Sequence, residues 1–291
     1  MKILVTNSGG FTGKYLVPYL QRNPENTVIP YDGDCIEELE EVISSECPKE
    51  IYHLRGSFTD CYAIDHVNNV LATYDILRLA RDYSARVLLI GSAAEYGNTP
   101  SPIKETDPLN PSSVYGLTKV MQSQIMQFAF KEWYVDVVMA RTFNLYGKGI
   151  SPTLFVGSLY SQITELKEGR RDKIILENLE AYRDYLHIEG AIQLYEMIMT
   201  FGEPGEIYNV GSGYPTKVYD IMVKILKEEN IPLDVVKQDL RVCHRKNEPR
   251  QIYADISKIN TLRLRAEIRA LKKTIKELNS GRNEGVNGQS F

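Results

Sequence analysis

Cysteine is scarce in this sequence, and its few copies are scattered. Cys35, Cys47, Cys61 and Cys243 are the four cysteines among 291 residues, and no two of them form a C-x-x-C pair. This spacing argues against a disulfide framework or a zinc motif, and it favours a reduced, cytoplasmic chain whose cysteines have no role. The four histidines show no H-E-x-x-H spacing, so we expect no metal site.

Long apolar runs are absent too. No stretch reaches the roughly 18 apolar residues of a transmembrane helix, and the apolar part of the start, MKILVTNSGG, is too short for a signal peptide. A net charge of −4 argues against a general nucleic-acid binder. The composition, 43% apolar and 25% charged, is typical of a soluble globular protein. We therefore expect neither nucleic acid nor a membrane among its partners.

Expected strands and helices alternate through the first half of the chain. The strand segments are short, apolar and rich in β-branched residues, and the segments between them have helical periodicity. Such alternation predicts right-handed crossovers and a doubly wound parallel sheet of the α/β class. The expected strands are 2–6, 27–32, 50–56, 86–92 and 135–144, and the expected helices are 14–22, 36–45, 66–84 and 114–133.

A glycine-rich turn, VTNSGGFTGKYL, joins the first expected strand to the first helix. Gly10 and Gly13 fit the second and third glycines of G-x-x-G-x-x-G, with Phe11 and Thr12 between them. Asn7 takes the first place, where asparagine tolerates left-handed backbone angles. A helix that starts here offers free N–H groups to a pyrophosphate. The alternative is a merely structural turn, but the flanking strand and helix favour a nucleotide site.

Asp32 follows Gly13 by 19 residues, the distance expected of an acid that binds the adenosine ribose of NAD. Only one strand-like segment lies between the first two helices, where two are common. Asp32 therefore either ends the second strand and faces the ribose, or belongs to a later strand and faces the adenine.

Tyr115 and Lys119 lie four residues apart at the start of an expected helix, on one helical face. A free tyrosine has a pKa of about 10, and a nearby positive charge lowers it. A tyrosine tuned in this way exchanges a proton with a carbinol oxygen while a nicotinamide exchanges hydride. Chance pairs of this spacing are common, but Ser92 ends a strand before them and can hydrogen-bond the same oxygen.

Together these segments resemble the extended short-chain dehydrogenases/reductases, in the nucleotide-sugar epimerase/dehydratase family, over about residues 1–260. The matching motifs are the glycine turn, HLRG, NNV, GSAAEYG, YGLTK, RTFNLYG, EAYRDYLHIEGA and IYNVGSG. The resemblance implies that Ser92, Tyr115 and Lys119 are catalytic and that the cofactor is NAD or NADP. It also implies that Leu54, Arg55 and Asn69 lie beside the cofactor, and that Lys119 binds the nicotinamide ribose as well. Arg55 replaces a small alanine of the family, so it either meets a phosphate or crowds the pocket.

The same resemblance implies a nucleotide-diphosphate sugar as substrate. Asn144 would contact the sugar diphosphate, Arg245 would pair with the diphosphate, and Glu248 would bind the nucleotide ribose hydroxyls. Arg183 either binds substrate or pairs structurally with Asp184. His187 is expected to be a packed histidine and not a general base.

Three branches of the family compete. Dehydratases need an acid and a base where this chain has Ala93 and Ala94, so elimination of water lacks its general base. Glu95 before Tyr96 resembles the GDP-4-keto-6-deoxy-mannose reductases, whereas the alanines resemble 4-epimerases. We expect a reductase, with a 4-epimerase as the alternative. A sensor that binds a dinucleotide without turnover usually lacks the tyrosine or the lysine, and this chain has both.

The chain is expected to divide into three parts. Residues 1–145 would form a Rossmann-type dinucleotide-binding domain, to which a segment near 183–200 returns. Residues 146–278 would form a smaller α/β substrate-binding lobe, and 279–291 a flexible tail. The helices 66–84 and 114–133 would build a four-helix homodimer interface, with Phe128 facing either the partner or the core.

Overall fold

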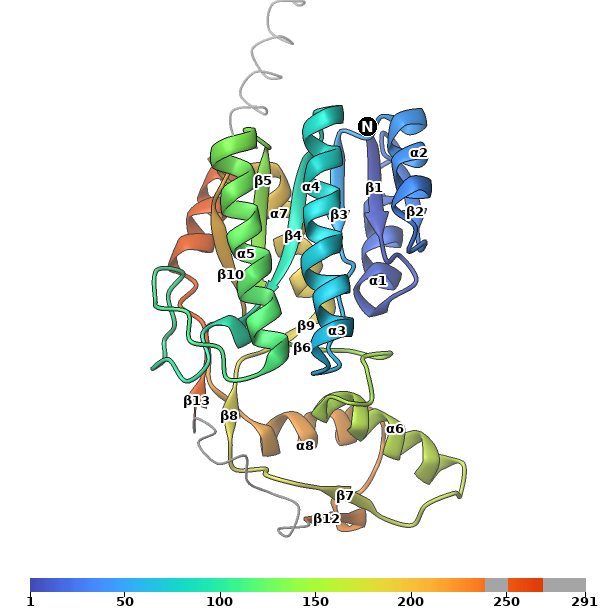
Figure 1. The fold of residues 1–291 in the computed structure, drawn as a ribbon. Coiled ribbons are helices and arrows are strands. Elements are labelled where there is room, and N and C mark those ends of the chain that lie inside the picture. Colours follow the sequence, from blue (N-terminus) through green and yellow to red (C-terminus); the bar gives the residue numbers. More distant parts are fainter. Residues whose placement is uncertain (239–250, 269–291) are drawn as a thin grey trace, which may run out of the picture.

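The computed structural model describes residues 1–238 and 251–268. A central sheet has helices on both faces, and a smaller lobe lies below the ends of its strands (Figure 1). Within the described ranges, no helix combines the length and apolar character needed to cross a bilayer.

The central sheet has six parallel strands in the order β10-β5-β4-β3-β1-β2. Its neighbouring side chains alternate between the two faces, as the two-residue period of a strand requires. Both faces are apolar because helices cover both, which confirms the predicted α/β class. The strands are β1 Lys2–Thr6, β2 Thr27–Tyr31, β3 Glu50–His53, β4 Arg86–Ser92, β5 Val137–Thr142 and β10 Ile207–Val210.

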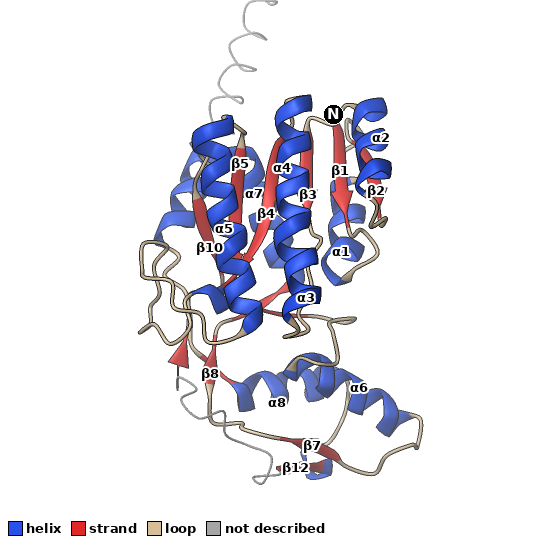
Figure 2. Cartoon of the chain, in the orientation of Figure 1, coloured by secondary structure: helices blue, strands red, loops and turns tan. Residues whose placement is uncertain are grey.

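Two layers of helices sandwich this sheet (Figure 2). Ile3 and Val5 of β1 pack in one core with α1 (Phe11–Leu20) and α7 (Ile188–Phe201), which residues 257–268 also join. Leu4 of the same strand packs in the opposite core. That core also contains residues of α2 (Ile36–Glu46), α4 (Ala72–Tyr83) and α5 (Val114–Trp133).

The edge of the sheet is formed by β2, which pairs directly with β1 from Lys2↔Thr27 to Thr6↔Tyr31. The chain then passes through α2 straight to β3, on the other side of β1. The single strand between the first two helices is therefore the neighbour of β1. Asp32, which follows it, stands next to the glycine turn.

The helix expected at 66–84 starts earlier and is not uniform. It is preceded by α3 (Tyr62–Asp65), and a π-helical segment, His66–Leu71, precedes α4. Such wide turns are frequent at functional sites. This one holds the buried side chain of Asn69.

The smaller lobe has a core of its own, built from buried residues of α6, α8 and β7. Three segments after Asn144 pack with the main sheet instead: α7 covers it, β10 extends it to Val210, and residues 257–268 join its core. The lobe elements are β6 Asn144–Tyr146, α6 Phe155–Lys167, β7 Ile174–Leu176, β8 Tyr182–Arg183, β9 Tyr185–His187, β11 Thr216–Lys217, α8 Val218–Glu228, β12 Val236–Gln238 and β13 Gln251–Ile252.

Candidate active site

The glycine turn has the backbone geometry that a phosphate-binding turn needs. Asn7 has a φ of 52°, the left-handed conformation predicted for it. A Cβ on Gly13 would lie 2.3 Å from the Ser8 carbonyl oxygen, so only glycine lets α1 approach the end of β1 this closely. The first bond within α1 runs from the Lys14 N–H to the Gly10 carbonyl, 3.0 Å. The N–H groups of the first three helical residues, Phe11, Thr12 and Gly13, are therefore available to an anion, whereas that of Gly10 bonds the Asn7 carbonyl.

Asp32 stands beside this turn. Its carboxylate accepts hydrogen bonds from the Gly9 N–H and the Ser8 hydroxyl, both at 2.7 Å. The Gly9 hydrogen bond, followed by that of Ser8, lowers the pKa of Asp32. The structure thus places an ionised acid at the end of β2, next to the turn, where sequence spacing put a ribose ligand.

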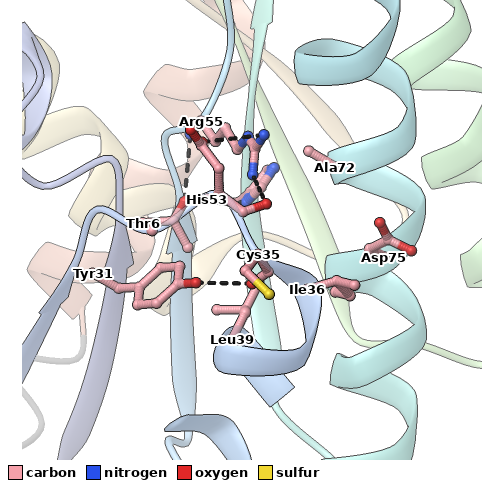
Figure 3. Close-up of a pocket in the computed structure, with 11 residues that line it drawn as sticks. Thr6, Tyr31, Cys35, Ile36, Leu39, His53, Arg55, Ala72 and Asp75 are labelled. Atoms are coloured by element: carbon pink, nitrogen blue, oxygen red, sulfur yellow. Dashed lines mark hydrogen bonds and ion pairs between the residues drawn. The ribbon is translucent and has the colours of Figure 1, made fainter. Parts of the chain in front are cut away.

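Arg55 crosses a small pocket between the loops that follow β2 and β3 (Figure 3). Its guanidinium donates to the Asp34 carbonyl at 3.1 Å and to the Asn68 side chain at 3.2 Å, and forms an ion pair with the Asp34 carboxylate at 3.2 Å. Thr6 holds the same loop, because its hydroxyl accepts from the backbone N–H groups of Leu54 and Arg55. Arg55 therefore lines the pocket and is held in place by its bonds to Asp34 and Asn68.

Ser92, Tyr115 and Lys119 converge at the carboxyl end of the sheet. Ser92 ends β4, and its side chain hydrogen-bonds that of Tyr115. Tyr115 lies in the first turn of α5, which starts where the Ser113 hydroxyl accepts from the Gly116 N–H at 3.0 Å. Lys119 follows one turn later, with Nζ 5.9 Å from the centre of the Tyr115 ring. The three residues that sequence order suggested therefore lie together.

Burial, and not the lysine charge, dominates the electrostatics of this cluster. Desolvation raises the pKa of Tyr115 to about 12, against the opposing effect of its Ser92 hydrogen bond. Desolvation also lowers the pKa of Lys119 to about 8, while Glu95 and Asp65 act to raise it. The expectation that Lys119 lowers the Tyr115 pKa is thus wrong for these side-chain positions. The lysine ammonium donates instead to the Ile90 carbonyl at 2.9 Å and to Gln122 at 3.0 Å.

A short loop after β3 covers Tyr115. The buried Asp65 carboxylate holds this loop by accepting from Ser57, Thr59 and Asp60. Phe58 then meets the Tyr115 ring edge to face, with centroids 4.7 Å apart. No sequence pattern pointed to Asp65, because its partners lie in an irregular loop.

Asn69, predicted beside the cofactor, is a buried anchor of the same region. Its amide exchanges hydrogen bonds with the backbone of Ser57, 2.9 and 3.0 Å, and donates to Thr118 of α5 at 3.0 Å. It fixes the loop after β3 against the helix that carries Tyr115. A direct contact between Asn69 and a cofactor remains a prediction.

The expected substrate residues are partly described. Asn144 lies beside Asp184, because its backbone and side-chain N–H groups donate to the Asp184 carbonyl at 3.1 and 3.2 Å. The guanidinium of the preceding Arg183 donates to the Tyr182 carbonyl at 2.7 Å. The Asp184 carboxylate is buried and accepts backbone N–H groups of residues 212, 213 and 254, so it has structural partners of its own. Arg245 and Glu248 lie outside the described residues.

His187 caps a helix, which agrees with a structural role. Its side chain accepts from the Glu189 N–H at the start of α7, and its ring packs edge to face on Tyr146. Across the part of the chain that the structure describes, no group of three or more potential metal ligands lies together.

Glu95 is the site residue whose importance sequence reasoning missed. Its side chain is fully buried, and one carboxylate oxygen accepts from the Ser92 N–H at 2.8 Å. The Ser92 side chain in turn caps the short turn Ala93–Glu95. The S-x-x-E spacing of a capping box was a signal that could have found it.

Comparison with known proteins agrees with this geometry. A family model described as the NAD dependent epimerase/dehydratase family matches residues 3–211. The GDP-6-deoxy-D-mannose reductase of Pseudomonas aeruginosa is 27% identical over 268 aligned positions, which cover 86% of this chain and 87% of that protein. A putative UDP-glucose 4-epimerase of Methanocaldococcus jannaschii is 25% identical, with 95% and 96% covered. The solved structure of RMD from Pseudomonas aeruginosa, complexed with NADPH, superposes with a TM-score of 0.80 at 24% identity, with 90% of this chain and 91% of that chain covered.

Proposed function

The chain belongs to the NAD dependent epimerase/dehydratase family, and from this premise we propose that it is an NAD(P)-dependent reductase of a nucleotide-diphosphate 4-keto-6-deoxy sugar. One observation supports the chemistry most directly. Ser92, Tyr115 and Lys119 lie together at the carboxyl end of the sheet, where the glycine turn also lies.

NAD or NADP fits the residues at this end of the sheet. The close approach at Gly13 and the free N–H groups of α1 suit a pyrophosphate, and Asp32 suits an adenosine ribose. The bound nicotinamide supplies the hydride that a carbonyl carbon accepts. We propose that Lys119 donates to the ribose of that nicotinamide, since its ammonium lies behind Tyr115.

The proton comes from this chain. Tyr115 is protonated at neutral pH, because its pKa is about 12, so it is poised to donate a proton to the oxygen of a ketone. The Ser92 hydroxyl, bonded to Tyr115, would orient the same oxygen. Tyr115 is desolvated, and Phe58 packs against its ring, so hydrogen bonds from Tyr115 and Ser92 to the ketone oxygen would be stronger than in water.

The absence of an acid and a base at Ala93 and Ala94 favours a reductase or a 4-epimerase over a dehydratase. Both of these need only the serine, tyrosine, lysine and cofactor. The resemblance of the Glu95–Tyr96 segment and the 27% identical relative support the reductase. The substrate diphosphate would be held by Asn144 and Arg183 and, outside the described residues, by Arg245, with Glu248 on the nucleotide ribose.

The first experiment identifies the cofactor released when purified protein is denatured, by mass and absorbance. A reductase exchanges its cofactor each turnover, so we expect little bound NAD⁺ and oxidation of NADPH or NADH at 340 nm with GDP-4-keto-6-deoxy-mannose. Tyr115→Phe should lower turnover by roughly 10²–10⁴-fold and still bind cofactor. Near-stoichiometric NAD⁺ with interconversion of UDP-glucose and UDP-galactose would establish the epimerase instead. A wild type that binds a dinucleotide but turns over neither sugar, with the same affinity in Tyr115→Phe, would indicate a sensor.

We also propose that two copies pair through α4 and α5. Val67, Leu71 and Tyr74 repeat along one face of His66–Leu71 and α4 and are 44–47% exposed. Leu117 and Phe128 continue the apolar surface on α5, which packs beside α4. A contiguous apolar surface of two helices fits a second copy of itself.

A cytoplasmic location is likewise a proposal, supported by the exposed free thiols Cys35, Cys47 and Cys61.

A further inference from the structure

A buried ionic network lies directly behind the catalytic residues. At its centre is Glu95, fully buried, whose carboxylate forms an ion pair with the equally buried Arg141 of β5 at 2.7 Å. Arg141 also donates to the Tyr96 hydroxyl at 2.9 Å, which donates to Asn209 of β10 at 2.8 Å. A buried charge pair is expensive to desolvate, so its presence beside a site calls for a reason other than stability.

The two carboxylate oxygens of Glu95 face two different catalytic elements. Oε1 accepts from the Ser92 N–H at 2.8 Å, at the end of β4. Oε2 accepts from the Ser123 hydroxyl at 3.0 Å, one turn beyond Lys119 on α5. A Cβ on Gly91 would lie 2.7 Å from Oε1, so β4 has glycine where this carboxylate enters. One side chain thereby links the serine of one element to the helix that carries the tyrosine and the lysine.

We propose that Glu95 is a positioning residue of the catalytic site: it fixes Ser92 relative to α5 and supplies the negative charge behind Lys119. The first part follows from the bonds to Ser92 and Ser123. The second part agrees with the electrostatics, since Glu95 acts to raise the pKa values of both Lys119 and Tyr115. The reaction at which this positioning acts rests on the proposed function.

Other charged groups surround Tyr115 and Lys119. Asp65 of α3, like Glu95, acts to raise the pKa values of both residues. Asp60 accepts from the Tyr115 N–H at 3.2 Å, and His53 of β3 is near enough for Lys119 to lower its pKa. Arg141 faces Glu95 from β5. Of the two acids that act on Lys119, Glu95 contributes the larger effect, and it also bonds both catalytic elements.

Two substitutions separate position from charge. Glu95→Gln preserves the length and removes the charge, whereas Glu95→Asp preserves the charge and shortens the link between Ser92 and α5. Ile43→Ala, on the buried face of α2, is the control for lost stability alone. Should Glu95→Gln fail to fold because Arg141 is left unpaired, Glu95→Gln/Arg141→Met removes both charges together.

The first readout needs no substrate. Carbon-13 NMR of ε-labelled lysine, with Lys119 assigned through Lys119→Arg, follows the titration of this amine. The midpoint should lie near 8 in the wild type, fall by about one pH unit in Glu95→Gln, and stay in place in Glu95→Asp and Ile43→Ala. An unmoved midpoint in Glu95→Gln overturns the electrostatic part even if the sugar specificity proposed above is wrong. In the double variant the loss of the Arg141 charge offsets part of the fall, so that variant tests positioning through turnover.

The second readout is turnover with the 4-keto sugar. Glu95→Asp should lower kcat about tenfold to a hundredfold with its basic limb unchanged, because the reacting groups are misplaced. Glu95→Gln should move the basic limb of the kcat/KM profile to lower pH, since Lys119 and Tyr115 lose their protons earlier. Variants that lose only unfolding stability, as Ile43→Ala does, would show that Glu95 merely supports the fold. A wild type without turnover would refute the proposed reaction and leave the lysine titration as the test of Glu95.

Discussion

Two buried bases near the catalytic residues have pKa values far from their ordinary ones. Desolvation lowers the pKa of His53 to about 3 and that of Lys119 to about 8. The Lys119 charge also contributes to the lowered pKa of His53. At the scale of single residues, burial therefore has the largest effect on these pKa values.

His53 should make the protein sensitive to acid. In the unfolded chain it takes up a proton below about pH 6.5, whereas the folded chain resists this down to about 3. The unfolded state binds more protons in this window, so stability falls as pH falls through it. Between pH 7.5 and 5 this single group should cost about 2 kcal/mol of unfolding free energy. Urea unfolding at several pH values would measure the slope.

The matched variants for this test are His53→Gln and His187→Gln. The first should lose about 2 kcal/mol less than the wild type over the same interval, because it has no proton to gain. The second, at a partly exposed helix cap, should fall as steeply as the wild type. Equal slopes in His53→Gln and the wild type would contradict the assignment.

Asp32 should set the choice between NAD and NADP. Its ionised carboxylate suits a ribose 2′-hydroxyl and repels a 2′-phosphate. In Asp32→Asn the ratio of NADP to NAD affinity should rise by roughly tenfold or more, the value of one charged hydrogen bond. Calorimetric titration with both dinucleotides measures it. Asp82→Asn, at an acid of α4 that pairs with Arg81, is the control and should leave the ratio unchanged.

At the scale of elements, close packing decides which sequence positions tolerate change. Gly13 and Gly190 are both the third residue of a helix, α1 and α7 respectively. A Cβ on Gly13 would meet backbone at 2.3 Å, whereas one on Gly190 would meet only the end of the Leu186 side chain at 3.2 Å. The two glycines hold the same position in their helices, but Gly13 faces the backbone of Ser8 whereas Gly190 faces a flexible side chain.

Gly13→Ala should therefore destabilise the protein by about 1–3 kcal/mol or more, since backbone must move. Gly190→Ala should be close to neutral or slightly stabilising, because alanine gains up to about 1 kcal/mol of helix propensity. Denaturant unfolding of both variants at one pH compares them. Equal losses would mean that the turn does not require the close approach seen here.

At the scale of the whole molecule, the apolar surface of α4 and α5 should hold two chains together. Tyr74 and Phe128, one from each helix, both pack edge to face on Trp133, so the two helices present one continuous surface. Leu71→Glu and Phe128→Glu place a charge on it and should convert the dimer to a monomer, because the desolvation of an unpaired carboxylate opposes association.

Light scattering on a size-exclusion column would give the number of chains per particle. Ile175→Glu is the matched control, since Ile175 is 49% exposed in β7 of the other lobe. It should leave the dimer intact. A wild type that elutes as one chain at all concentrations would show that this surface has another use.

The sequence alone determined the features that depend on local order. The alternation of strands and helices, the helix of Val114–Trp133 and the left-handed Asn7 all follow from periodicity and from the backbone preferences of single residues. The positions of Ser92 at the end of a strand and of Tyr115 and Lys119 at the start of the next helix predicted that all three lie at the carboxyl end of the parallel sheet.

Only the tertiary structure decided the rest, because it depends on contacts between residues far apart in the chain. Pairing of β2 with β1 placed Asp32 beside Gly9 and so resolved which strand it follows. The Glu95–Arg141 pair joins the turn after β4 to β5, and neither residue by itself predicts this contact in the sequence. The depth of burial, which no local pattern encodes, raised the pKa of Tyr115 and lowered that of Lys119.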